Sequence, residues 1–417
     1  MIVTTRNAGK YRQSSQSVVH TFPFLLGLLY VFDEQINLLV HANIIGSLLY
    51  VLATFIFCYR IILSKRAISL KLGALLILIT LFSFIAYSSS WGCSVVFKGA
   101  FSLLLLWLVV LAMQIVTLAE IVTLKSISNV VLISVLAFVC LDAMGIHLLS
   151  SDRNAGSYYE PSHLAMYVIP FIAYRFLKYN RDMLSWMAVA VVMLVAPNST
   201  FLVGLIGIFV LWLIKGRYLS NTAGRIRIAL VIAFVTSLLA LIDISNIQDR
   251  ISGVLDGAQG NETSSVSAIV WLNGWSQASE YFAVTRGLGV GFNQMGCEKY
   301  ENLGQFSSLM FTKLGVVLNS QDGSFLAAKL VSEFGFVGIL LVISLMLASV
   351  NSIFNINKDC GGGDSSIALA RAVGGICLLS LLFVRGAGYF QLPVILAISL
   401  LTLKLPKQAP ITKNNYG

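Results

Sequence analysis

The chain has 417 residues, of which 57% are hydrophobic and only 11% are charged. A soluble protein normally carries about a quarter charged residues, so this composition excludes an ordinary soluble domain. The formal net charge of +10 does not indicate nucleic-acid binding, because the Lys and Arg residues lie in short links between apolar runs.

Apolar runs follow one another along the chain, and a helix needs about 20 such residues to cross a bilayer. A membrane β-barrel would show short alternating segments instead, so we expect helices. The two runs on either side of 196–199 are either two short helices or one broken helix. We predict an all-α, polytopic membrane protein, with 1–417 forming a single integral membrane domain of about 12 transmembrane helices. The predicted spans are 18–32, 36–59, 71–90, 95–118, 128–149, 163–178, 183–197, 199–214, 226–242, 325–350, 366–385 and 389–404.

The distribution of basic residues predicts the orientation. An even number of spans places both termini on one side, and most Lys and Arg residues fall on that side, which the positive-inside rule makes cytoplasmic. The remaining basic residues are Lys98, Arg153, Arg250, Arg286, Lys299, Lys313, Lys329 and Arg385. The hydrophilic segment 243–324 is then one large periplasmic loop, and the protein is expected in the bacterial inner membrane.

Six cysteines are scattered along the chain without a CxxC motif or a Cys/His cluster. Neither a zinc site nor a disulfide framework is therefore expected. Cys93 and Cys297 are both predicted to face the oxidising side and could pair, although we favour the interpretation that they are separate thiols.

The predicted external loop 151–163 leads into a span. Pro161 suits the first turn of a helix, where its missing N–H costs nothing. Glu160 then lies at a helix N-terminus, which is favourable for a carboxylate. For Ser162 and His163 we favour capping and surface roles.

Arg153 and Glu160 lie in this short loop between two spans. Ionisable groups in such places usually pair with one another or face a water-filled cavity. A direct catalytic role and a salt bridge without catalytic meaning are equally well supported for this pair.

The long external segment contains an arginine followed by alternating glycines, Arg286–Phe292 (RGLGVGF). Gly287, Gly289 and Gly291 allow positive φ and close backbone approach, and exposed N–H groups can form an anion-binding nest. The segment lacks the helix context and the lysine of a P-loop, so nucleotide binding is not expected.

The long segment ends at 319–325 (NSQDGSF), which leads into a span with Lys329 and Glu333. Asp322 is either a helix cap or a functional carboxylate. Lys329 and Glu333 have the i,i+4 spacing of an ion pair, for which we favour a structural role.

Two further polar features lie near the predicted outer ends of spans. Asp33 and Glu34 form an acidic pair at the outer end of the first span, which we expect to set orientation or to contact water. Arg385 lies near the outer end of its span and either extends harmlessly to the interface or lends charge to a site. No DxD motif or His cluster is present, so no metal site and no cofactor are predicted.

Together these segments resemble the O-antigen polymerase (Wzy-type) family, within a wider group that includes O-antigen ligases. Ligases carry a His-Asn pair shortly before their last Glu–Gly segment, and this chain has no histidine after His163, which favours the polymerase. The resemblance rests on Arg153 with 156–162 (GSYYEPS), on 286–292, and on 321–325 (QDGSF) with 332–335 (SEFG).

The resemblance implies a glycosyltransferase of GT-C-like fold that needs no metal. Its donor would be a glycan on undecaprenyl pyrophosphate, and its acceptor a single repeat unit on the same carrier. An acceptor hydroxyl would attack the anomeric carbon of the donor, and the lipid pyrophosphate would leave. The implied partners are these lipid-linked glycans, membrane lipid and a separate chain-length regulator protein.

The candidate residues fit this chemistry. Fixed guanidinium groups suit a leaving group that gains negative charge, so Arg153 and Arg286 are the first candidates and Arg385 a third. Glu160 is the expected base for the acceptor hydroxyl, with Asp322 as the alternative. The residues expected to bind substrate are Tyr159, Gly287, Gly289, Gly291, Gln321 and Arg385.

Other functional classes share some of these features. A flippase or transporter of the same lipid-linked glycans would have similar hydrophobicity, but transporters usually show internal repeats, which this chain lacks. A peptidoglycan-type polymerase and an O-antigen ligase use related lipid-linked donors and stay open as alternatives.

Overall fold

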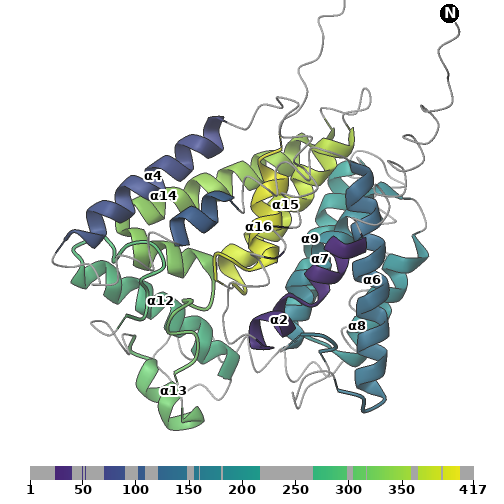
Figure 1. Ribbon diagram of the computed structural model, residues 1–417, viewed down its shortest axis with the longest axis horizontal. Helices are drawn as coiled ribbons and strands as arrows, with labels where there is room; N and C mark the ends of the chain where they lie inside the picture. Colours follow the sequence, from purple (N-terminus) through teal and green to yellow (C-terminus); the bar gives the residue numbers. More distant parts are fainter. Residues whose placement is uncertain are drawn as a thin grey trace, which may run out of the picture.

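The structure is a computed structural model, and its described part consists of helices joined by turns (Figure 1). Every secondary-structure element in this described part is helical, without a strand. The described residues are 24–39, 49, 52, 70–89, 102–108, 121–147, 155–158, 160–179, 182–216, 266–297, 304–315, 317–357, 365–386 and 388–403. The helices are α2 (Asp33–Leu39), α4 (Leu70–Tyr87), α6 (Ile121–Ala143), α7 (Pro161–Lys178), α8 (Met183–Val195), α9 (Ser199–Lys215), α12 (Val266–Val284), α13 (Ser307–Leu314), α14 (Leu326–Phe354), the 3-10 helix η3 (Asn355–Asn357), α15 (Ser365–Phe383) and α16 (Leu392–Leu401).

Three helical stretches in the described residues are long and apolar enough to cross a membrane: Leu124–Ala143, Leu326–Asn357 and Ser366–Phe383. Helices α4, α8, α9 and α16 contain shorter apolar stretches. Each of α4, α6 to α9 and α14 to α16 overlaps a predicted span. The predicted span 226–242 lies outside the described residues.

Helices α8 and α9 are two separate helices, which decides between the two alternatives for the segment around 196–199. Asn198 adopts an extended conformation, and its side-chain oxygen accepts a hydrogen bond of 2.8 Å from the N–H of Phe201. Asn is a favoured residue for this capping role. The chain therefore leaves one helix and starts the next at a side-chain cap.

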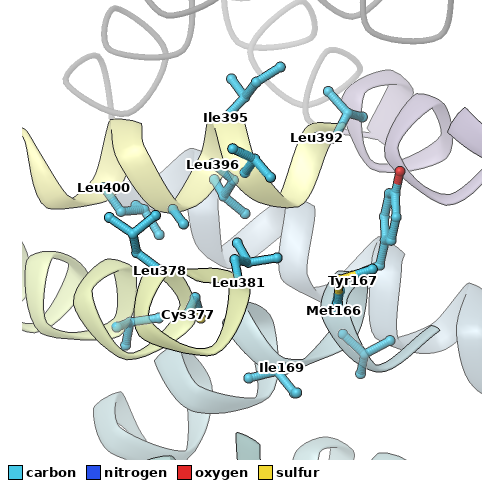
Figure 2. Close-up of a cluster of buried hydrophobic side chains, with 14 of the residues drawn as sticks. Met166, Tyr167, Ile169, Cys377, Leu378, Leu381, Leu392, Ile395, Leu396 and Leu400 are labelled. Carbon is cyan, nitrogen blue, oxygen red and sulfur yellow. The ribbon is translucent and has the colours of Figure 1, made fainter. Parts of the chain in front are cut away.

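Helix α7 is enclosed by other helices, with buried residues on all sides along most of its length. It packs against α6, α8, α9, α15 and α16, and α15 packs in turn against α14 and α16 (Figure 1). Figure 2 shows part of this core, in which the side chains of α7, α15 and α16 meet. The labelled members are Met166, Tyr167, Ile169, Cys377, Leu378, Leu381, Leu392, Ile395, Leu396 and Leu400.

Glycines bring several of these helices into close contact. A Cβ atom on Gly204 of α9 would collide with Ile169 of α7, and one on Gly375 of α15 would lie 2.9 Å from the carbonyl oxygen of Ser349 in α14. Lipid is as apolar as the helix surfaces, so helices in a membrane associate through such close packing rather than through water exclusion. Substitution of these glycines would separate the helices around α7 and α15.

The segment predicted as the large loop contains two helices, α12 and α13. Helix α12 packs against α14 and α13. Its Trp271 donates a hydrogen bond of 2.9 Å to the carbonyl oxygen of Phe383, at the end of α15, and its ring stacks on Phe325. The predicted loop is thus fastened to the helix ends next to the polar region.

Helix α14 is interrupted at Gly335, whose φ of 54° and ψ of −124° are not helical. The turn after α12 fills this break: the N–H of Phe336 donates to the carbonyl oxygen of Gly287 at 2.8 Å, and the N–H of Gly291 donates to that of Glu333 at 2.8 Å. These hydrogen bonds from the turn satisfy backbone groups that the break in the helix leaves unpaired.

Cys297 is disulfide-bonded, whereas Cys140 and Cys377 are free. The interpretation of Cys297 as an unpaired thiol is therefore wrong. Cys93, the alternative partner considered from the sequence, lies outside the described residues.

The break in α14 predicts a strong effect of Gly335→Ala. The backbone conformation is unfavourable for an L-residue, and the new Cβ would collide with the carbonyl of Gly287. We expect a loss of about 1–3 kcal/mol from conformational strain alone, measured as a lower melting temperature of the purified protein. Gly73→Ala is the matched control, because Gly73 is helical and a Cβ atom there would have no neighbour within 4 Å. Equal melting of the two variants would contradict this role of Gly335.

Candidate functional site

Three segments that are far apart in the sequence bring five charged side chains together. Arg385 Nη2 lies 3.1 Å from Glu160 Oε2. Lys329 Nζ lies 2.9 Å from Asp322 Oδ1 and 4.0 Å from Glu333 Oε1. The charge of Arg385 also acts on Asp322, which joins the two sets of ion pairs. We call Glu160, Asp322, Lys329, Glu333 and Arg385 the charged cluster.

The segment before Glu160 is anchored by Asp142, at the end of α6. The carboxylate of Asp142 accepts hydrogen bonds from the N–H groups of Ala155 at 2.6 Å and Gly156 at 2.9 Å. Gly156 has a φ of 66° and lies directly against Val139 of α6. This turn holds the chain against α6 just before it enters α7.

Glu160 is the N-cap residue of α7, and Pro161 occupies the first turn, as predicted from the sequence. The Glu160 side chain does not cap the helix. Its carboxylate instead accepts hydrogen bonds from Ser162 Oγ at 2.9 Å and from Arg385. The side chain is 36% exposed, so an ion-paired carboxylate faces the solvent at the start of the largely buried helix α7.

Lys329 is the buried centre of the charged cluster, with only 2% of its side chain exposed. Its ammonium group donates to the carbonyl oxygen of Gln321 and to Asp322, both at 2.9 Å, and lies 5.0 Å from the centre of the Tyr389 ring. Burial of an ammonium group is costly unless such partners surround it. The predicted i,i+4 contact with Glu333 is confirmed, but Lys329 also bonds the loop before α14.

Asp322 is 40% exposed and does not cap α14, whose N-cap residue is Phe325. The capping alternative is therefore wrong. The Lys329 ammonium lowers the pKa of Asp322 against the opposing effect of burial, and the charge of Arg385 lowers it further. Asp322 is thus a stably ionised carboxylate beside Arg385.

The glycine turn after α12 differs from the expectation. Gly287, Gly289 and Gly291 all have positive φ, as predicted. Their N–H groups, however, are hydrogen-bonded within the protein, that of Gly289 to Thr285 Oγ1 at 2.9 Å and that of Gly291 to the Glu333 carbonyl. These glycines allow the turn to lie against α14, and their N–H groups do not point to a substrate.

The anion that this turn does bind is a side chain of the protein. The carboxylate of Glu333 accepts hydrogen bonds from the N–H groups of Asn293 at 2.8 Å and Met295 at 3.3 Å. Glu333 is fully buried. The turn therefore fastens itself to α14 through the charged cluster, directly before the break at Gly335.

Of the other predicted site residues, two are exposed and two lie outside the described part of the chain. Arg286 is exposed, has a φ of 54°, and forms no ion pair with any residue that the structure describes. Gln321 is exposed and contributes its carbonyl group to Lys329. Arg153 and Tyr159 lie outside the described residues.

His163, which the sequence interpretation placed at the surface, borders the charged cluster and links α7 to the acidic pair on α2. His163 Nδ1 lies 2.6 Å from Glu34 Oε1. Asp33, next to Glu34 on α2, is buried and accepts a hydrogen bond from the Tyr167 hydroxyl, which points toward α2 in Figure 2. The expectation that Asp33 contacts water is therefore wrong, and His163 is not simply a surface residue. His163 lies three residues after Glu160, which places both on one face of the helix. This spacing was the feature of the sequence that could have indicated a position of His163 near the site.

The charged cluster can bind an anion next to solvent-facing carboxylates, since a guanidinium group has several N–H donors that match phosphate oxygens. No group of three or more His, Cys, Asp or Glu residues in the described part of the chain could hold a metal ion. Comparisons with protein-family models, curated proteins and solved structures found no match to this chain.

The burial of Lys329 leads to a testable coupling. Lys329→Met leaves the buried Glu333 carboxylate without its cation, which we expect to cost about 3–5 kcal/mol. The double variant Lys329→Met/Glu333→Gln removes both buried charges and should recover part of this loss. Thermal unfolding of the single and double variants measures the coupling. Additive losses would show that the two charges are energetically independent.

Proposed function

We propose that the protein is an O-antigen polymerase of the Wzy type, a metal-independent glycosyltransferase of the inner membrane. It joins oligosaccharide repeat units carried on undecaprenyl pyrophosphate at the periplasmic face. The hydroxyl of an acceptor unit attacks the anomeric carbon of the donor glycan, and lipid pyrophosphate is the leaving group.

The observation that carries this proposal is the ion pair between Arg385 and Glu160 beside Asp322. These residues come from three of the segments on which the family resemblance and the external charge pattern rest. Both carboxylates are substantially exposed. The Arg385 guanidinium uses Nη2 for Glu160, while its Nη1 forms no hydrogen bond with any described residue. Unused donors of a fixed guanidinium are suited to a diphosphate.

The cation and the carboxylate of the charged cluster have different roles toward the leaving diphosphate and the donor sugar. Arg385 stabilises the negative charge that grows on the leaving diphosphate. Asp322 stays ionised and suits the positive charge that develops on the donor sugar, as carboxylates do in other glycosyl-transfer reactions. Arg153 and Arg286 are proposed as further cations for the diphosphate, and chain-length control is assigned to a separate partner protein.

The membrane arrangement supports this assignment. Helices α6, α14 and α15 are long and apolar enough to span a bilayer. We propose about 12 spans with both termini in the cytoplasm, from the length of the apolar runs and the charge distribution. Cys297 is disulfide-bonded, and disulfides persist in oxidising compartments such as the periplasm, which supports an external position of the segment 243–324.

Deletion of the gene in its native host tests the function. A polymerase mutant should accumulate lipid A–core that carries a single repeat unit, and a plasmid copy should restore the ladder of long chains on a lipopolysaccharide gel. Loss of all glycan from the core would instead indicate the ligase or the flippase. An unchanged ladder would contradict every one of these roles.

Arg385→Ala in the plasmid copy should abolish long chains at normal protein level. Loss of a fixed group that stabilises transition-state charge typically slows a reaction by about 10²–10³-fold. Arg371→Ala is the matched control, because Arg371 lies in the first half of α15, the helix that Arg385 directly follows, and on the predicted cytoplasmic side. A normal ladder with Arg385→Ala would remove Arg385 from the active site.

A further inference from the structure

His163 and Glu34 form a carboxylate–imidazole pair at the edge of the charged cluster. His163 Nδ1 lies 2.6 Å from Glu34 Oε1, which joins α7 to α2. The His163 side chain is 18% exposed and that of Glu34 is 10% exposed. A carboxylate at one ring nitrogen fixes the tautomer and orientation of the imidazole, and it leaves the other nitrogen to accept a proton.

The second ring nitrogen of His163, Nε2, is available to accept a proton. Nε2 has no hydrogen-bond partner among the residues that the structure describes, whereas Nδ1 is used by Glu34. The ring lies three residues after Glu160, on the same face of α7. A proton on His163 would lower the pKa of Asp322, so the ring is close enough to this exposed carboxylate to influence it.

The carboxylates of the charged cluster are less suited to accept a proton. Glu160 already accepts hydrogen bonds from Ser162 and Arg385. Asp322 is held in its ionised form by Lys329. Glu333 is fully buried among backbone N–H groups. An imidazole is also the side chain that serves most often as a general base near neutral pH.

We propose that His163 is the catalytic base of the polymerisation, with Glu34 as the residue that orients it. This assignment rests on the proposed function. The acceptor hydroxyl gives its proton to His163 Nε2 while its oxygen forms the new bond to the anomeric carbon. The bond from that carbon to the pyrophosphate oxygen breaks, and its electron pair leaves with the lipid pyrophosphate beside Arg385. Glu160, the base expected from the sequence, then holds Arg385 in place.

A purely structural role of the pair is the competing explanation, because the contact also fastens α2 to α7. Two substitutions at His163 separate the two roles. His163→Gln can keep a hydrogen bond to Glu34 but cannot act as a base at neutral pH. His163→Ala removes the ring and leaves space for added imidazole.

The test is polymer formation by purified protein in proteoliposomes that contain a synthetic lipid-linked repeat unit. We expect His163→Gln to melt like the wild type and to lose about 10²–10⁴-fold in turnover. Added imidazole should restore part of the turnover of His163→Ala but none of that of Arg385→Ala. Glu34→Gln should slow turnover, because the ring loses its orienting carboxylate.

Each result has one meaning. Wild-type turnover in His163→Gln overturns the assignment of His163, and so does a folded, inactive His163→Ala that imidazole does not rescue. A wild-type protein that forms no polymer overturns the proposed function itself. That outcome is read before any variant is compared, so the two failures are distinguishable.

Discussion

The buried ammonium group of Lys329 is the interaction on which the polar region depends. It lies on the first turn of α14 and reaches back to the Gln321 carbonyl and to Asp322, which fixes the loop before the helix. It also neutralises part of the charge of Glu333, whose carboxylate anchors the turn after α12. A charge in this position is tolerated only with all of these partners, so one lysine couples the loop, the helix and the turn.

This coupling explains how irregular backbone exists next to apolar helices. Helix α14 breaks at Gly335, and the turn after α12 supplies the hydrogen bonds that the break would otherwise leave unmade. Non-helical backbone at membrane depth is tolerated where protein or water satisfies its polar groups. In this molecule the break and the turn together hold Asp322 and Lys329 opposite the start of α7. The candidate site thus lies where the helices end or bend, while their apolar lengths form the scaffold.

The sequence predicted the positions of many helices, but it predicted few of the partners of the charged residues. Hydropathy predicted the described apolar helices because each needs only a local run of apolar residues, and Pro161 marked the start of α7 for an equally local reason. The partner of Glu160 was not predictable, because Arg385 lies 225 residues away and only packing of α15 against α7 brings it there. The glycine segment 286–292 predicted an anion-binding nest, but the carboxylate of Glu333 is bound by the N–H groups of Asn293 and Met295, which follow that segment. His163 was assigned to the surface because its partner on α2 is equally remote in sequence.

Direct observation of a bound lipid diphosphate tests the central claim, that the charged cluster is the site of glycosyl transfer. The measurement is an electron cryomicroscopy structure of the protein in lipid nanodiscs with undecaprenyl pyrophosphate. We predict a diphosphate oxygen at about 3 Å from the Arg385 guanidinium, on the side of the cluster shared with Asp322 and His163. A diphosphate bound at the opposite ends of these helices, near Arg175 and Lys178, would contradict this claim.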